Sequence, residues 1–467
     1  MIIVLTGATG LIGHALGQRL VREGHQLRAL VRDPQRAFMP FPAELFSWDI
    51  RKPAPAEAFK GADAVIHLAG ENVAAKRWTE ARKKALRDSR IQGVESLRQG
   101  LELSRNSRPQ SEKEKLVFIS ASGAGFYGDR GDEWLGEDAA PGDDFLARLC
   151  QEWEAAALAV PARRTVIARF GVVLSLRGGF LRELAPMFQR FGAARLGSGG
   201  AWLSWIHIDD VVAALMLALT DSELSGAVNF CAPKPATNSE VTAALKRSLG
   251  AFPVPPAPRL GIRLLLGELS QALLGSQRTR PERLTARGFR WRHSDFSSAI
   301  QELYGEIKSG ETRLVFEQWV AAPATEVWPF FSSERNLERL TPAFLSFHVL
   351  GKTTEQMGEG TNIDYRLKVH GIPIRWRSVI RDWNPPHAFV DEQVSGPYRK
   401  WHHRHEFETL AGGTLLRDTV VLKPPLGWLG RAATLGFILQ DVEAIFAFRA
   451  QAIRAIFSRP SQETSPR

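Results

Sequence analysis

The chain has 467 residues, a hydrophobic fraction of 44% and a formal net charge of +10. This length predicts two or three domains, with enough apolar side chains for a packed core in each. The two cysteines, Cys150 and Cys231, lie far apart and show no Cys/His metal spacing, which argues against a disulfide framework and against a zinc centre.

The positive charge is interleaved with acidic residues, as in KRWTEARKKALRDSR at 76–90, a pattern typical of the solvated face of a helix. It comes without a helix-turn-helix, zinc or RNA-binding signature, so we do not expect nucleic acid as a partner. The opening MIIVLTGATG lacks the basic region and the cleavage site of a signal peptide, and no apolar run reaches the roughly 18 residues that span a bilayer. We therefore expect a cytoplasmic protein without a transmembrane segment.

The first third of the chain alternates apolar, strand-like runs with helical stretches. Strands are predicted over 1–7, 25–32, 62–70, 116–123 and 164–175, with helices between them. Because the strands are nearly all apolar, we expect a parallel sheet covered on both faces, that is, a doubly wound α/β domain. The less regular residues 178–304, which include the proline-rich 253–258, suit a small substrate lobe.

The segment TGATGLIG at 6–13 links the first strand to the first helix. Glycines there let the backbone turn tightly and approach a pyrophosphate, and the helix N-terminus supplies free N–H groups. The strand, loop, helix and second strand all fall within about 30 residues, as a dinucleotide-binding unit requires. This predicts a phosphate loop formed by Gly7, Gly10, Leu11, Ile12 and Gly13.

The end of the second strand indicates which cofactor the loop binds. Enzymes that use NAD place an acidic side chain there, whereas this chain has Arg32, whose guanidinium suits the 2′-phosphate of NADP. Asp33 competes for this role, but Pro34 follows it and favours a turn or a helix cap. We therefore expect NADP as the cofactor.

A second pattern begins after a polar linker at 305–313. A strand at 314–323 and a short helical stretch at 325–340 precede five strand-like runs, at 361–370, 374–383, 387–394, 401–410 and 413–422. Residues 430–457 then repeat apolar side chains at three- and four-residue steps, which predicts one apolar face on a long helix. We expect an α+β domain at 312–456, in which a curved antiparallel sheet holds that helix, and a disordered tail at 457–467.

Several motifs give the first 308 residues or so a resemblance to a known family: TGATGLIG, VIHLAGENVAAKRW, SRIQG, FISASGAGFYGDRGDEW, PGDDFLARLCQEWEAAA, ARFGVVLS, WIHIDD and NFCAPKPATNSE occur in this order. The chain resembles the epimerase-like branch of the extended or atypical short-chain dehydrogenase/reductases, of the NAD-dependent epimerase/dehydratase type. Residues 250–300 resemble the C-terminal segment of that branch. The resemblance implies an NADP-binding Rossmann domain with Leu68, Ala69, Gly70 and Arg90 along the cofactor.

Residues 312–456 resemble the START-like (SRPBCC) helix-grip superfamily, which includes polyketide cyclases, lipid carriers and coenzyme-Q-binding proteins. The resemblance rests on the order of the elements and on an opening of the form VxAPxxxVW, here at 320–328. It implies an apolar cavity between the sheet and the helix, and hence a hydrophobic ligand.

The usual catalytic pair of short-chain dehydrogenases is missing. In typical members a tyrosine transfers the proton, a lysine four residues later lowers its pKa, and a serine orients the substrate. At that helix this chain has Phe145 and Leu149, which cannot transfer a proton but can wall the pocket. The serine is retained as Ser122, with Ser120 as its neighbour, and Tyr127 on the following loop is the candidate proton donor.

Other polar residues of this half have less direct interpretations. Tyr127 could instead pack against the cofactor or the lobe, and Arg90 could be a surface charge. Glu152 and Glu154 flank Trp153 on the following helix and are further possible substitutes for the missing pair. Glu152 lies one helical turn from Arg148, so an ion pair is expected for it. His207 and Asp209 could meet substrate, although that segment more often braces the cofactor domain against the lobe.

In the second half, strand alternation places Trp401, His403, His405 and Phe407 on one face. Two histidines could begin a metal site, but no third ligand stands out in the sequence, so we predict no metal and favour a cavity wall or a surface cluster.

These observations predict an NADP(H)-dependent oxidoreductase or epimerase fused to a domain that binds a hydrophobic ligand. The alternative is a non-catalytic NADP(H)-sensing protein with a ligand-binding regulatory domain. The sequence names neither the substrate nor the direction of hydride transfer. It allows a homo-oligomer without indicating one.

Overall fold

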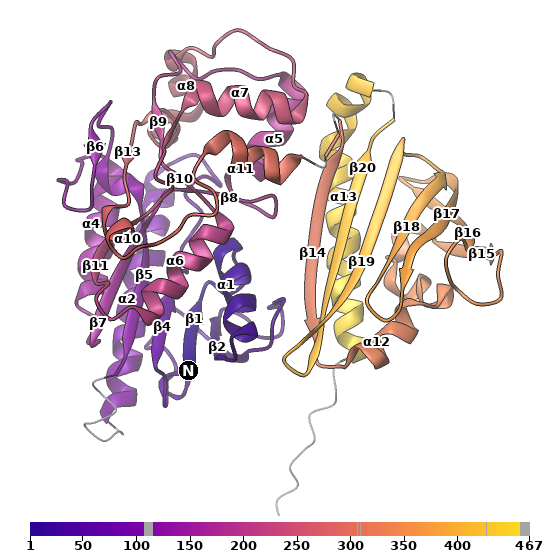
Figure 1. Cartoon of the computed structure of the whole chain (residues 1–467), viewed down its shortest axis with the longest axis horizontal. Coiled ribbons are helices and arrows are strands. Elements are labelled where there is room, and N and C mark those ends of the chain that lie inside the picture. Colours follow the sequence, from indigo (N-terminus) through magenta and orange to yellow (C-terminus); the bar gives the residue numbers. More distant parts are fainter. Residues whose placement is uncertain (107–114, 306, 309, 426, 458–467) are drawn as a thin grey trace, which may run out of the picture. The chain divides into compact units, whose positions relative to one another are not determined.

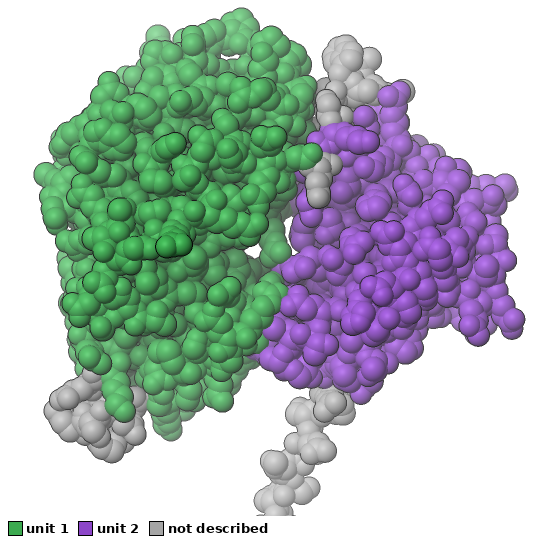
Figure 2. Space-filling view, viewed as in Figure 1, with its two compact units in different colours: residues 1–37, 43–306 green, residues 38–42, 307–467 purple. Residues whose placement is uncertain are grey.

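We describe a computed structural model of the chain, covering residues 1–106, 115–305, 307–308, 310–425 and 427–457. The chain divides into two compact units, coloured separately in Figure 2: Met1–Ala37 with Ala43–Glu306, and Phe38–Pro42 with Ile307–Arg467. None of the helices in the described part combines the length and the apolar character needed to cross a membrane. The predicted tail at 457–467 lies outside the described residues except for Phe457.

The first unit is built on a seven-stranded parallel sheet. Its strand order is β11-β7-β5-β4-β1-β2-β3, so the order reverses between β1 and β4 (Figure 1). The strands are β1 (Ile2–Thr6), β2 (Gln26–Val31), β3 (Glu44–Ser47), β4 (Ala64–His67), β5 (Val117–Gly123), β7 (Arg164–Phe170) and β11 (Gly226–Phe230). In such folds ligands bind at the carboxyl ends of the strands, where the order reverses.

Helices cover both faces of this sheet. On one face, α2 (Glu80–Asn106) and α4 (Phe145–Leu158) pack through Leu97 and Trp153 against Val65 and Phe118 of the sheet. The other helices of the parallel fold are α1 (Leu11–Arg22) and α6 (Ile208–Thr220), whereas α7 (Asn238–Leu249) lies in the lobe (Figure 1). This confirms the predicted doubly wound domain, since buried strands and amphipathic helices alternate along the chain.

Short elements between and after the later strands form the lobe. The two-stranded pairs are β8 (Val172–Leu174) with β10 (Trp205–His207), β9 (Trp202–Leu203) with β12 (Ala236–Thr237), and β6 (Trp134–Leu135) with β13 (Arg278–Thr279). The helices are α5 (Phe180–Phe191), α8 (Arg259–Leu266), α9 (Ser270–Leu274), α10 (Glu282–Ala286) and α11 (Phe296–Tyr304).

The second unit is an antiparallel seven-stranded sheet with a long helix. The strand order is β14-β20-β19-β18-β17-β16-β15. Its elements are β14 (Thr312–Val320), α12 (Ala324–Phe331), β15 (His348–Lys352), β16 (Asn362–Val369), β17 (Ile372–Asn384), β18 (Ala388–Ser395), β19 (Lys400–Leu410), β20 (Gly413–Lys423) and α13 (Gly427–Phe457). Figure 1 shows α13 lying along this sheet, as the helix-grip prediction requires.

The apolar face predicted for the last helix packs against the sheet. Val442 and Phe446 of α13 join Val420 and Leu422 of β20 in one buried cluster, and the rings of Phe316 and Phe446 stack at 3.9 Å. Leu435 also belongs to the predicted apolar face, but its side chain lies outside the described residues. The other apolar side chains of this face are removed from water by the packing, which stabilises the unit.

Two local predictions for the second unit were wrong. The helical stretch predicted at 325–340 ends as α12 at Phe331, and only single 3₁₀ turns follow it, at Glu334–Asn336 and Glu338–Leu340. Pro329 lies inside α12 and cannot donate a backbone hydrogen bond, which favours a short helix. Strand β15, the edge strand next to β16, was not predicted.

Five residues of the β2–β3 connection belong to the second unit. They are Phe38–Pro42, and within that unit the backbone N–H of Trp319 donates to the carbonyl oxygen of Met39 over 3.2 Å. The chain that follows Arg32 therefore contributes backbone to the helix-grip fold before it returns to β3.

Candidate functional site

The glycine loop follows β1 and is formed as a dinucleotide-binding turn requires. Gly7 has a φ of +71°, and a Cβ there would lie 2.7 Å from the carbonyl carbon of Leu68. A Cβ on Gly13 would lie 2.2 Å from the oxygen of Gly7. Any side chain at Gly7 or Gly13 would therefore collide with backbone. The loop leads into α1, whose N-cap residue Gly10 carries no side chain to cap the helix, so no side chain occupies the place where an anion can meet the first amide groups.

Arg32 directly follows β2, the neighbour of β1, and its side chain is exposed. Asp33 takes part in a turn. Its carboxylate accepts the backbone N–H of Gln35 over 2.9 Å, and its carbonyl oxygen accepts the N–H of Arg36. The predicted turn at Asp33 is confirmed, and Arg32 remains the charged side chain at this end of β2.

The residues after β4 lie beside the glycine loop. The hydroxyl oxygen of Thr6 accepts the backbone N–H groups of Leu68 and Ala69, each over 3.2 Å. Gly70 lacks a side chain where the guanidinium of Arg90 approaches, since a Cβ there would lie 3.4 Å from Cζ of Arg90. The reversal of strand order between β1 and β4 therefore places the glycine loop beside Leu68, Ala69 and Gly70, the residues predicted to run along a cofactor.

Arg90 is buried rather than a surface charge. It donates to the carbonyl oxygens of Leu86 and Glu71, over 3.0 and 3.1 Å, and its guanidinium carbon lies 5.0 Å from the ring centroid of Trp153. A guanidinium fixed against an aromatic face is a rigid charged wall of the site.

The serine near the carboxyl end of β5 is paired with a buried carboxylate. Oγ of Ser122 donates to Oε1 of Glu154 over 2.7 Å, and Arg169 donates to both carboxylate oxygens, over 2.9 and 2.8 Å. Ser122 and Arg169 are partners in the register of β5 and β7, and Glu154 comes from α4. All three are buried. The fork of Arg169 fixes the orientation of the Glu154 carboxylate.

Tyr127 lies on the far side of Arg169 in this network. Its ring is fully buried, and its hydroxyl donates to Oδ1 of Asn229 over 2.7 Å and accepts Nη1 of Arg169 over 3.0 Å. Burial, ahead of the opposing effect of Arg169, raises the pKa of Tyr127 to about 12. Ser122 and Tyr127 are thus joined through Arg169 and Glu154. Within the described residues no hydrogen bond joins them directly.

The helix that should carry the tyrosine and the lysine begins at Phe145, where Asp144 caps it by accepting the N–H of Ala147. Phe145 and Leu149 pack with Trp78 and Leu86 in an apolar cluster. Neither of them can titrate, and both fit the predicted role of a wall. On the same helix, the ion pair predicted between Glu152 and Arg148 was wrong, because Glu152 pairs with Arg87 of α2 over 2.6 Å.

Several members of the buried network were missed by sequence reasoning. Glu154 was named with Glu152 only as a possible substitute, and Arg169, Asn229 and Glu137 received no role. Glu137 accepts backbone N–H groups of Asn229, Glu282 and Arg283, which ties the lobe to the C-terminal segment. A signal existed for Glu154, because it shares an otherwise small and apolar helix face with Ala147, Cys150 and Ala157.

His207 and Asp209 take up the bracing position. His207 is buried and caps α6, and its ring lies 3.8 Å from that of His293, a residue of the 250–300 segment. Asp210 accepts the backbone N–H groups of Arg292 and His293. Burial, followed by His293, lowers the pKa of His207 to about 4. His207, Asp209 and His293 could together hold a cation, but Arg292 lies 3.3 Å from the Asp209 carboxylate and already neutralises it.

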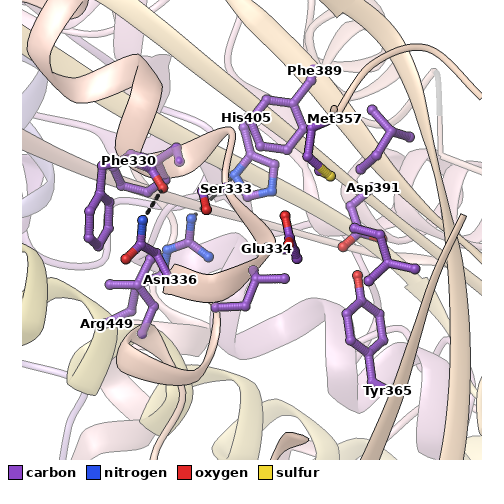
Figure 3. Close-up of a pocket in the computed structure, with 15 residues that line it drawn as sticks. Phe330, Ser333, Glu334, Asn336, Met357, Tyr365, Phe389, Asp391, His405 and Arg449 are labelled. Carbon is purple, nitrogen blue, oxygen red and sulfur yellow. Dashed lines mark hydrogen bonds between the residues drawn. The ribbon is translucent and has the colours of Figure 1, made fainter. Parts of the chain in front are cut away.

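The second unit contains a cavity between its sheet, the turns after α12, and α13 (Figure 3). The enclosed cavity is small, about 20 Å³, and the value reaches about 400 Å³ only when all gaps between the lining atoms and the part open to solvent are counted. Aromatic and aliphatic side chains such as Phe330, Leu340 and Ile380 form most of its wall, and Asp391, His405 and Arg449 add charge.

The predicted shared face of β19 is confirmed, because His403, His405 and Phe407 all point into the interior. The third potential ligand that the sequence did not reveal is Asp418, whose Oδ1 lies 3.0 Å from Nε2 of His403 and 2.6 Å from Nδ1 of His405. The guanidinium of Arg449 lies 3.5 Å from the same oxygen. A fixed cation at that distance disfavours a metal ion, so we interpret the cluster as a hydrogen-bonded network.

Comparisons with known proteins agree with this division. Residues 3–231 match the NAD dependent epimerase/dehydratase family, 257–303 a domain of unknown function (DUF1731), and 320–446 the polyketide cyclase / dehydrase and lipid transport family. An epimerase family protein of Mycobacterium bovis is 38% identical over 308 residues, which cover 64% of this chain and 96% of that protein. YfhF of Bacillus subtilis is 31% identical over 315 residues, covering 66% and 100%.

Two solved structures resemble the same part of the chain. Human epimerase family protein SDR39U1 (isoform 2) with NADPH has 28% identity and a TM-score of 0.57, and the match covers 66% of this chain and all of that one. A nucleoside-diphosphate sugar epimerase of Corynebacterium glutamicum has 35% identity and a TM-score of 0.52, with 66% and 59% covered.

Proposed function

Because the chain belongs to the epimerase family, we propose that its first unit is an NADP(H)-dependent oxidoreductase or epimerase and that its second unit binds a hydrophobic ligand. The observation that carries the catalytic part is the buried Ser122–Glu154 pair at the carboxyl end of β5, beside the strand order reversal. Such a pair can replace the missing tyrosine and lysine in handling a proton.

The cofactor part rests on the glycine loop and on Arg32. The tight turn that Gly7 and Gly13 permit and the uncapped start of α1 fit a pyrophosphate, and the exposed Arg32 fits a 2′-phosphate. The human relative with NADPH supports the same choice. Leu68, Ala69, Gly70 and Arg90 would line the nicotinamide half. When bound, the cofactor supplies or accepts the hydride.

The hydrogen bonds of Ser122 define the route of the proton. A substrate hydroxyl that donates to Oγ of Ser122 can pass its proton through the serine to Oε1 of Glu154, while its carbon loses a hydride. In the reverse direction Glu154 returns the proton to the carbonyl oxygen as the carbon gains a hydride. Arg169 fixes the orientation of the Glu154 carboxylate, and Oε1 of that carboxylate already contacts Ser122, so the pair is placed to take up or return the proton. Tyr127 holds Arg169 and is a positioning residue in this proposal.

The catalytic proposal and the sensor alternative differ in one measurable outcome. NADPH deuterated at C4 would be incubated with the full chain and a small-molecule extract, and transfer of deuterium to any metabolite would be followed by mass spectrometry. An oxidoreductase labels at least one metabolite. The reverse direction would be tested with the oxidised cofactor and a deuterated extract. If the chain binds NADPH but transfers no deuterium in either direction, the non-catalytic sensor is supported.

A further inference from the structure

Charged side chains line or border the cavity of the second unit, and most of them pair with one another. Arg449 of α13 neutralises Asp418 of β20, and Lys352 pairs with Glu334 over 2.8 Å. In Figure 3 the guanidinium of Arg449 lies beside His405, while Asp391 and Tyr365 lie together on the other side of the cavity. The lining charges therefore form two groups, separated by apolar side chains.

The group around Arg449 is paired within the protein, except that the buried Nε of Arg449 has no hydrogen-bond partner among the described residues. Burial would raise the pKa of Asp418, but Arg449, His405 and His403 together hold it well below its ordinary value. An ionised Asp418 cannot donate, so Nδ1 of His405 carries the hydrogen in their 2.6 Å contact. Burial, followed by His403, lowers the pKa of His405 to about 3, so the ring is neutral. A ligand anion at Arg449 would lie beside the ionised Asp418, which already contacts the same guanidinium.

Asp391 differs from the other acidic residues of the cavity. Its Oδ1 is buried and has no hydrogen-bond partner among the described residues, and no ion pair there involves its carboxyl group. Its neighbour Tyr365 already shares a hydrogen bond with Ser378 over 2.8 Å. Burial, against His403, Ser378 and Arg449, raises the pKa of Asp391. A buried polar atom without a partner costs free energy, which a ligand can recover by supplying one.

We propose that this cavity binds an uncharged apolar molecule whose oxygen-bearing end, a hydroxyl or a carbonyl, forms a hydrogen bond with Asp391. The inference rests on the proposed function of the second unit and specifies its ligand class. An ionised Asp391 accepts from a hydroxyl, and a protonated one donates to a carbonyl. Carboxylates are disfavoured because Asp418 already contacts Arg449, Glu334 already pairs with Lys352, and Glu334, Asp391 and Asp418 repel a further negative charge.

The test uses the full chain and the neutral fluorescent probe 1-aminoanthracene, displaced at pH 7.5 by decan-1-ol, decan-2-one or decanoate. We expect at least one of the two neutral compounds to displace half of the probe at a concentration roughly tenfold below that of decanoate, a difference of about 1.4 kcal/mol. If both do so equally, Asp391 serves either oxygen; if one is preferred, it identifies the hydrogen-bonding form of Asp391.

A variant then assigns the preference to one side chain. Asp391→Leu should weaken the preferred neutral compound about tenfold. Glu392→Leu on the same strand should leave it unchanged, because its side chain points to the other face of β18. The comparison of neutral compounds with decanoate requires no variant, so it stands even if Asp391→Leu fails to fold by circular dichroism.

The outcomes separate the two proposals. If the probe does not bind at all, the hydrophobic-ligand function of the second unit is wrong. If the probe binds but decanoate displaces it as well as the neutral compounds do, or a folded Asp391→Leu binds them with unchanged affinity, that function stands and the assignment to Asp391 is overturned.

Discussion

Oγ of Ser122 lies 2.7 Å from Oε1 of Glu154, although the two residues are 32 positions apart and come from β5 and α4. Arg169, which pairs with Ser122 across β5 and β7, holds the same carboxylate through both of its oxygens. A fold that has lost the usual tyrosine and lysine thus retains its serine and gives it a fixed proton acceptor. The proposed chemistry depends on this pair, and the predictions below test it and its surroundings.

Arg32 should determine the choice of cofactor. We expect the chain to bind NADPH more tightly than NADH, and Arg32→Ala to remove most of the difference. The loss of a charge-assisted contact with a phosphate costs about 1.5 to 3 kcal/mol, or roughly tenfold to 150-fold in affinity. Titration of cofactor fluorescence measures both constants. Arg36→Ala, a neighbouring exposed arginine, is the control. Equal affinities for the two cofactors in the unmodified chain would contradict the assignment.

Tyr127 should matter for turnover through Arg169. Tyr127→Phe removes the hydroxyl that contacts Arg169 and Asn229 but leaves the buried ring, so the fold should be retained. We expect turnover to fall by about tenfold or more with nearly unchanged NADPH affinity. A pH profile distinguishes the two roles of this residue. A positioning residue lowers the rate at every pH, whereas a direct proton donor shifts the profile. A shifted profile would restore the sequence-based role of Tyr127 as the donor.

The cofactor loop was predictable because its constraints are local. Gly7, Gly10 and Gly13 lie within one turn between a strand and a helix, and Arg32 and Asp33 end the next strand of the same unit. The role of Glu154 was not predictable in this way, because Ser122 and Arg169 reach it only after β5, β7 and α4 have packed. Its weak signal was a carboxylate on an apolar helix face.

Asp418 could have been found from the sequence, by contrast. The turn at Ala411–Gly412 has positive φ at both positions, as a two-residue hairpin of this kind requires. Leu410 then pairs with Gly413, and the register that follows places His405 opposite Asp418. The register of this hairpin thus identifies Asp418 as the third member of the cluster with His403 and His405. Strand β15 and the end of α12 depended on tertiary packing and were missed.

The buried histidines should make the first unit sensitive to acid. Burial, followed by the charge of Arg90, lowers the pKa of His67 to about 3, below the 6.5 of an exposed histidine. The unfolded chain therefore takes up the proton first, so stability is present above pH 6.5 and is lost as the pH falls toward 3. At pH 5 the loss from His67 is about 2 kcal/mol.

Calorimetric unfolding at pH 7 and pH 5 measures this dependence. His67→Asn should lower stability at pH 7 but reduce the further loss between pH 7 and pH 5. His348→Asn, which changes an exposed histidine, should not alter that loss. An unchanged pH dependence in His67→Asn would show that other groups, such as His207, account for the acid sensitivity of the unit.

The two units should fold separately. Fragments that end at Lys308 or begin at Glu311 each contain a complete sheet and its covering helices. We expect both to show cooperative thermal unfolding by circular dichroism. The second fragment lacks Phe38–Pro42 and the hydrogen bond from Trp319 to Met39, so it should melt below the same unit in the intact chain. An unfolded second fragment would mean that this segment is essential to it.

The most direct test of the central claim is deuterium transfer from C4-deuterated NADPH by Glu154→Gln, measured on whichever metabolite the unmodified chain labels. Glutamine keeps the shape of the side chain and can still contact Ser122, but it cannot take up or release the proton. Glu152→Gln, two residues away on the exposed side of α4, is the matched control. We predict that Glu154→Gln lowers the labelling rate by at least about 10²-fold with unchanged NADPH affinity, and that Glu152→Gln leaves it unchanged. Full labelling by a folded Glu154→Gln variant would contradict the proposed role of the Ser122–Glu154 pair.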